Sequence, residues 1–158
     1  MEIINDIEEI NKLSKNCNFQ TIKVCLVGIS GSGKTAFLDR IHYKNNFNNF
    51  KELIKGNLST TGGNYKVILV KYKDKLFMLD LWDTSGQLRY FHIIKIFYKD
   101  VHVILNFYDP FNKESFEYIK NCFLSVKELD NPFLCSYILI KNKYDLNETK
   151  DKKITISD

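Results

Sequence analysis

The sequence predicts an α/β fold with a doubly wound, mostly parallel sheet of about five strands, one of them antiparallel within a hairpin. Three observations lead to this prediction. Short apolar runs recur along the chain and are nearly continuous, as in strands that are buried on both faces. Segments with helical spacing of apolar residues separate most of these runs. Two neighbouring runs are joined by a linker that is too short for a helical crossover, so those strands are expected to be antiparallel.

The 158 residues are enough for one domain with a sizeable core. We expect this domain to occupy 21–158, after an N-terminal extension over 1–20. Within the extension, isoleucines at helical spacing allow residues 3–13 to form a short amphipathic helix. An N-terminal segment without fixed structure is the alternative. The acidic residues of this segment do not fit a signal peptide.

The first expected strand, Ile22–Val27, leads directly into the sequence GISGSGKT at 28–35. This sequence matches GxxxxGK[ST] in its required strand-to-helix context, which makes the predicted fold that of a P-loop NTPase. Its glycines allow backbone N–H groups to point inward and bind phosphate at a helix N-terminus. A glycine-rich helix cap with an unrelated lysine is the alternative.

Two side chains of this loop have specific expected roles. Lys34 is expected to reach the β- and γ-phosphates of a nucleotide, and the Thr35 hydroxyl is expected to ligate Mg²⁺. The expected phosphate-binding residues of the loop are Gly28, Ser30, Gly31, Ser32, Gly33, Lys34, Thr35 and Ala36.

The loop is followed by a helical pattern over Gly33–Tyr43 and then by a segment rich in Asn and Lys, which is typical of an exposed loop. The antiparallel hairpin comes next. Its strands are expected at Val67–Tyr72 and Leu76–Trp82, with residues 73–75 as the turn.

The second hairpin strand ends in the sequence DTSGQ, which begins at Asp83. Asp83 is expected at the carboxyl edge of the sheet, where doubly wound folds bind ligands, and there it can hold Mg²⁺ through water. Gly86 would let its backbone N–H approach the γ-phosphate. Gln87 is the candidate catalytic residue, because its side chain could orient an attacking water.

A further strand at Val101–Phe107, a helix at Glu114–Leu129 and a last strand at Cys135–Ile140 complete the expected order. The last strand leads into a base-recognition sequence. Asp145 can accept the two hydrogens that guanine offers from N1 and its exocyclic amine, a pair that adenine lacks. Asn142 would hold the base and the phosphate loop together, and the stem of Lys143 would lie over the purine. These residues predict GTP or GDP as the ligand.

Composition excludes several other classes of protein. Of the 23 basic residues only two are arginine, and the lysines are spread along the chain, so we expect no nucleic-acid partner. The four cysteines form no CxxC pair, which favours a reduced, cytoplasmic protein. Every apolar run is shorter than the roughly 18 to 20 residues that span a bilayer, so we expect no transmembrane helix.

From about Ile22 to Leu146 the chain resembles a small GTPase of the Ras superfamily, and the Rab branch is the closest fit. Trp82–Gln87 with the following Arg89 resembles the Rab sequence WDTAGQER, and Phe97–Val101 resembles YYRGA. The sequence FYD at 107–109, followed by ESF, resembles the VYD and ESF elements of the family.

The resemblance implies a switch that binds and hydrolyses GTP with Mg²⁺, in vesicle trafficking. It also implies effector, exchange-factor and activator proteins that bind through switch I and switch II, and a location peripheral to endomembranes through such partners. Thr60 matches the switch I threonine that ligates Mg²⁺, with Thr61 as the alternative. Phe47 matches an aromatic residue that leans on the guanine.

The chain departs from the family pattern in four places. Switch I is longer than usual, with Phe50–Asn57 inserted, and Leu88 stands where Rab proteins carry an acidic residue. Gly63 and Asn64 replace the Val-Asp of the family. Few residues follow Asp145, so we expect the last strand, its base loop, the last helix and a cysteine for prenylation to be absent. We therefore expect no intrinsic membrane anchor and an apolar sheet face beside the first strand, which the N-terminal helix could cover.

Two other functions fit part of the sequence. A pseudo-GTPase that acts as a nucleotide-binding scaffold without significant hydrolysis is favoured by the missing C-terminal elements and opposed by the intact Lys34, Thr35, Asp83 and Gln87. An ATP-using P-loop enzyme is disfavoured by the base-recognition sequence.

Overall fold

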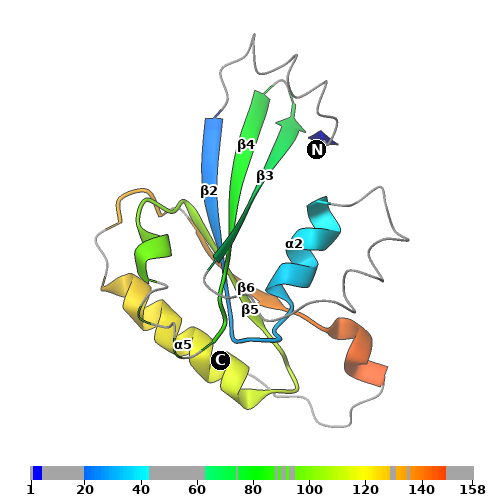
Figure 1. Cartoon of the computed structure of the whole chain (residues 1–158), viewed down its shortest axis with the longest axis vertical. Coiled ribbons are helices and arrows are strands. Elements are labelled where there is room, and N and C mark those ends of the chain that lie inside the picture. The colour runs from blue at the N-terminus through cyan, green and yellow to red at the C-terminus, as the bar shows by residue number, and fades with distance from the viewer. Residues whose placement is uncertain are drawn as a thin grey trace.

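A mixed six-stranded sheet with the strand order β1-β3-β4-β2-β5-β6 forms the centre of the molecule (Figure 1). The computed structural model describes residues 2–4, 20–42, 63–73, 75–87, 89, 92, 95–128, 131–134 and 136–148. Its strands are β1 (Glu2–Ile4), β2 (Gln20–Val27), β3 (Gly63–Tyr72), β4 (Lys75–Thr84), β5 (Val103–Tyr108) and β6 (Ser136–Lys141). Its helices are α2 (Lys34–His42) and α5 (Lys113–Lys127), with 3-10 turns η2 (Lys95–Tyr98) and η3 (Tyr144–Glu148).

Parallel pairing around β2 aligns the carboxyl ends of four strands. Leu26 of β2 lies opposite Asp83 of β4 on one side and opposite Leu105 of β5 on the other, and Tyr108 of β5 lies opposite Lys141 of β6. β3 and β4 form the expected antiparallel hairpin. The prediction of a doubly wound, mostly parallel sheet with one antiparallel hairpin strand is confirmed, and the aligned strand ends form the edge where such folds bind ligands.

The two helices pack on opposite faces of the sheet (Figure 1). Alternate residues of each strand point to opposite sides, so both faces of the sheet carry apolar side chains that a helix can cover. On one face α2 covers a cluster made by Val24, Leu26, Leu38, Ile68, Val70, Leu81 and Phe107. On the other face α5 covers a cluster made by Cys25, Val27, Tyr98, Val101, Ile104, Tyr108, Tyr118, Ile119, Cys122 and Val126. Burial of these apolar side chains fixes both helices, and thereby the loops at their ends.

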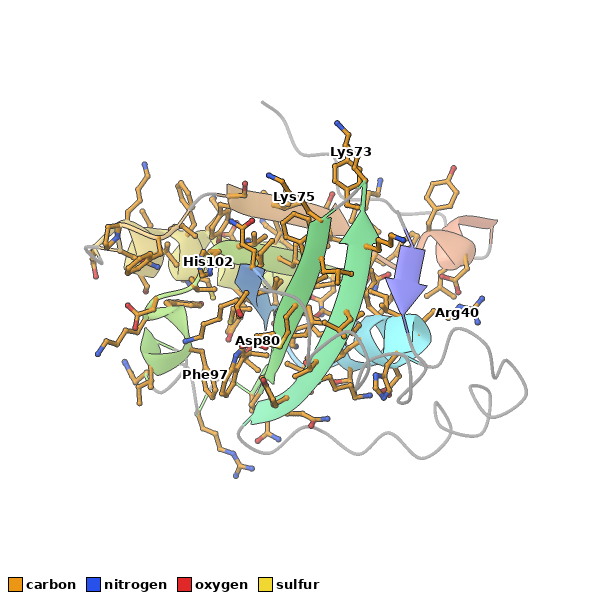
Figure 2. The ribbon with its side chains drawn as sticks, turned by 90° about the horizontal axis from the view of Figure 1, so that it is seen from above. Arg40, Lys73, Lys75, Asp80, Phe97 and His102 are labelled. Atoms are coloured by element: carbon orange, nitrogen blue, oxygen red, sulfur yellow. The ribbon has the colours of Figure 1, made fainter. Side chains whose placement is uncertain are left out.

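The N-terminal segment extends the sheet. Figure 2 shows β1 beside β3, and the strands are antiparallel, with Ile3 opposite Val70. The prediction of a helix over residues 3–13 is therefore wrong at Ile3 and Ile4, while residues 5–13 lie outside the described part of the chain. The physical reason is that an edge strand exposes unpaired N–H and C=O groups, and two β-branched residues favour pairing with them. Glu2–Ile4 thus pair with β3.

The edge strand β6, at the opposite side of the sheet from β1, exposes large apolar side chains. Ile138 and Leu139 of β6 are 45% and 46% exposed, so both sides of this strand carry apolar surface.

Within the described ranges, neither helix combines the length and the apolar character needed to cross a bilayer. Cys25 and Cys122 are buried as free thiols.

An ion pair between Asp39 and Lys66 ties α2 to β3. Their side chains retain only 12% and 14% exposure, respectively, so the pair is largely shielded from water. A shielded charge that loses its counter-charge destabilises the folded state more than an exposed one does.

We therefore expect Asp39→Asn to lower the free energy of unfolding by about 1 to 3 kcal/mol, measured by denaturant unfolding. The double variant Asp39→Leu with Lys66→Met removes both charges and is the control. It should recover most of the loss. Equal stability of Asp39→Asn and the wild type would contradict the role of the pair.

Candidate functional site

The phosphate loop follows β2 and ends where α2 begins at Lys34. Gly28, Gly31 and Gly33 have φ values of +152°, +76° and +96°, in a region that L side chains rarely adopt. The Ser32 N–H donates to the Ile29 carbonyl at 3.1 Å, which closes the turn. The loop therefore wraps around the positive end of the α2 dipole, the arrangement that binds phosphate in many proteins.

The side chain of Asn142 joins the base-recognition segment to this loop. Its Nδ2 donates to the Ser32 carbonyl at 2.8 Å, and its backbone N–H donates to the Tyr108 carbonyl at 3.0 Å. A Cβ atom on Gly33 would lie 2.1 Å from Asn142 Nδ2. Glycine at position 33 is thus required both by the backbone conformation and by the approach of Asn142.

Gly86 packs against the opposite side of the phosphate loop. A Cβ atom at this position would lie 2.3 Å from the Ser30 nitrogen, and the Ser30 N–H donates to the Gly86 carbonyl at 2.8 Å. The segment after β4 and the segment after β2 are therefore in direct contact.

Lys34 is buried at the base of the loop, with 5% exposure. Its Nζ donates to the Gly28 carbonyl at 2.6 Å and to the Ile29 carbonyl at 3.2 Å. Burial lowers the pKa of Lys34 to about 8, and the nearby Asp83 carboxylate opposes this shift. A phosphate bound in the loop would compensate the charge that burial disfavours.

Asp83 and Thr35 form the candidate metal centre. Asp83 is fully buried, and its Oδ2 accepts a hydrogen bond from Thr35 Oγ1 at 2.6 Å. Burial raises the pKa of Asp83, whereas the bond from Thr35 and the charge of Lys34 lower it. In the described part of the chain, Asp83 Oδ1 is buried without a hydrogen-bond partner.

These two residues fit Mg²⁺. A carboxylate oxygen that lacks a partner beside a hydroxyl is the kind of oxygen donor set that Mg²⁺ prefers. The described ranges contain no cluster of three or more His, Cys, Asp or Glu side chains that could hold a metal. Mg²⁺ takes one or two protein carboxylates and completes its coordination with water and phosphate.

Gln87 lies at the rim of the site and is half-buried. Its Oε1 accepts a hydrogen bond from Arg89 Nε at 2.7 Å, and its N–H donates weakly to Ser85 Oγ at 3.4 Å. The amide that is expected to orient water is thus engaged by a neighbouring arginine.

The base-recognition residues follow β6. Lys143 has a φ of +59°, and its Nζ donates to Asp109 Oδ2 at 2.8 Å. Asp145 lies in the first turn of η3 and is exposed. Sequence reasoning missed Asp109, although an acid close after an expected strand resembles the signal that identified Asp83, and Asp109 directly follows the observed β5.

Three further candidates, Phe47, Thr60 and Thr61, lie outside the described residues. Ala36 lies in the first turn of α2, directly after the loop.

The family model and the related proteins that match this chain agree on one family. A model described as the Ras family matches residues 23–158. The Ras-related protein Rab-13 of Mesocricetus auratus is 35% identical over 130 residues, which are 82% of this chain and 60% of that protein. The Ras-related protein Rab-1 of Theileria parva is 33% identical over 129 residues, 81% of this chain and 55% of that protein. The Ypt/Rab-type GTPase ypt7 of Schizosaccharomyces pombe is 33% identical over 132 residues, 82% of this chain and 61% of that protein. Across these three relatives the chain spans 55% to 61% of their length.

The two loop glycines allow a matched test of the contact with Asn142. Gly31→Ala and Gly33→Ala both place a side chain at positive φ, but a Cβ on Gly31 meets no atom within 4 Å. We expect Gly33→Ala to weaken GDP binding at least about tenfold more than Gly31→Ala, because only the former displaces Asn142. Titration with a fluorescent GDP analogue measures both affinities. Equal losses would show that backbone strain alone matters.

Proposed function

This chain belongs to the Ras family, and from that premise we propose that it is a Rab-type switch that binds GTP and GDP and hydrolyses GTP. The observation that carries the proposal is the hydrogen bond from Asn142 to the Ser32 carbonyl. It joins the segment suited to guanine and the segment suited to phosphate in one site.

Each residue of the site has a role in this proposal. The loop N–H groups and Lys34 bind the β- and γ-phosphates, and Asp145 selects guanine. Thr35 and Asp83 would hold Mg²⁺, which neutralises charge that develops on the phosphates during transfer. Gln87 orients the attacking water once its amide is released from Arg89. Thr60 is the candidate switch I ligand of the metal.

Domain organisation and partners follow from the same proposal. Residues 21–158 form the GTPase domain and residues 1–20 an extension. Effectors, exchange factors and activators would bind at the switches, and the protein would be cytoplasmic, reaching endomembranes in vesicle trafficking through such partners. An aromatic cluster on β3, β4 and η2 supports this. The Tyr65 and Trp82 ring centroids are 4.9 Å apart, those of Trp82 and Phe97 are 5.7 Å apart, and Tyr65 is 46% exposed.

A nucleotide-binding scaffold without significant hydrolysis is the second candidate function. One contact favours it, because the Gln87 amide oxygen already accepts a hydrogen bond from Arg89. A scaffold would keep guanine nucleotide affinity and lose only the chemical step. An ATP-using enzyme is disfavoured, since Asn142 connects the phosphate loop to a segment suited to guanine.

Base selectivity tests the proposed ligand. Asp145→Asn should lower GDP affinity and shift preference toward xanthine nucleotides, because an amide presents a donor where guanine also presents one. Competition binding against labelled GDP measures this. Asp100→Asn, the same change in an exposed turn, is the control and should match the wild type. Displacement of labelled GDP by ATP as effectively as by GTP would exclude a guanine-selective site.

Hydrolysis separates the switch from the scaffold. Gln87→Leu should slow single-turnover GTP hydrolysis by about tenfold or more with GDP affinity nearly unchanged, because a group that orients water acts in the transition state. Gln20→Leu makes the same change at an exposed position of β2 and should leave the rate unaltered. If wild type and Gln87→Leu hydrolyse GTP equally slowly, the scaffold is the better description.

A further inference from the structure

Asp109 is a buried acidic residue at the carboxyl end of β5, outside the phosphate, metal and base motifs. It is 7% exposed, and both of its carboxylate oxygens have partners. Oδ1 accepts a hydrogen bond from the Phe111 N–H at 2.9 Å, and Oδ2 accepts one from Lys143 Nζ at 2.8 Å. The carboxylate therefore bridges the loop after β5 and the base-recognition segment after β6.

The first turn of α5 fixes the backbone of Asp109. The Asp109 N–H donates to Ser115 Oγ at 3.0 Å, and the Ser115 hydroxyl lies 2.9 Å from the Asp109 carbonyl and 2.7 Å from the Asn112 carbonyl. Asn112 itself caps α5 by accepting from the Glu114 N–H at 3.0 Å. Asp109 thus presents its carboxylate from a rigid position rather than from a flexible loop.

Lys143 is the basic partner of this carboxylate. Its backbone has a φ of +59°, a conformation that residues other than glycine rarely adopt. A free lysine side chain samples many rotamers, and the ion pair with Asp109 restricts them. The two side chains are 30% and 10% exposed, so water screens the pair less than it screens a pair on the surface.

We propose that Asp109 is a positioning residue for guanine binding: it holds the Lys143 ammonium so that the lysine stem is in place over the purine before the nucleotide enters. The inference rests on the proposed function. In this arrangement the ammonium of Lys143 binds Asp109, and the apolar stem of the lysine is available to contact the base. Ordering the stem in advance removes part of the entropy that binding would otherwise cost.

Two substitutions isolate this contact. Asp109→Asn removes the charge and retains an oxygen that can accept from Phe111, whereas Lys143→Met keeps a stem of similar length and removes the ammonium. Each should speed dissociation of a fluorescent GDP analogue, with Mg²⁺ present, by about five- to tenfold, as expected for loss of one partly exposed charged hydrogen bond. The double variant should dissociate at the rate of either single variant, because both remove the same interaction.

Glu117→Gln, in an exposed pair with Lys120, is the control and should dissociate like the wild type. A double variant whose acceleration is the product of the two single effects would overturn the proposal, since the residues would then act independently. If Asp109→Asn does not fold, Lys143→Met alone decides, and unchanged dissociation would reject the role of the ammonium. If the wild type binds GDP and both single variants release the GDP analogue at the wild-type rate, this inference alone is refuted. Wild-type protein that does not bind GDP refutes the proposed function and the inference together.

Discussion

The hydrogen bond from the Asn142 side chain to the Ser32 carbonyl is the interaction on which the site depends. It crosses from the loop after β6 to the loop after β2, two strands apart in the sheet. The parallel register makes it possible, because β2, β5 and β6 end at the same edge. It also explains the glycine at position 33, where any side chain would collide with the amide. Without this bond the phosphate and base segments would be two separate loops.

A second constraint acts beneath the loop, where Lys34 and Asp83 are buried with opposite charges. Burial disfavours both charged forms, lowering the pKa of the lysine and raising that of the acid. The protein retains these groups although apolar side chains would be less costly to bury. A bound anion and cation would each find a partner there, since Asp83 Oδ1 has none among the described residues. The site is therefore preorganised for a charged ligand at some cost in stability.

Much of the fold and of the site could be predicted from sequence because the responsible signals are local. Continuous apolar runs predict the strands, and the order of the motifs places the phosphate loop, Asp83 and Asn142 after or at strand ends. What could not be predicted depends on contacts between distant segments. Glu2–Ile4 pairs with an open strand edge, an option that helical spacing alone does not reveal. Likewise, the bond of Lys143 to Asp109 joins two segments and depends on side-chain geometry that spacing does not determine.

In the proposed function, one guanine nucleotide occupies the site formed by the phosphate loop and the segment after β6. The most direct measurement is the nucleotide content of the purified protein, released by denaturation and separated by chromatography. We expect guanine nucleotide, mainly GDP, at close to one equivalent per chain. Adenine nucleotide in its place, or no nucleotide together with no thermal stabilisation by added GDP and Mg²⁺, would contradict it.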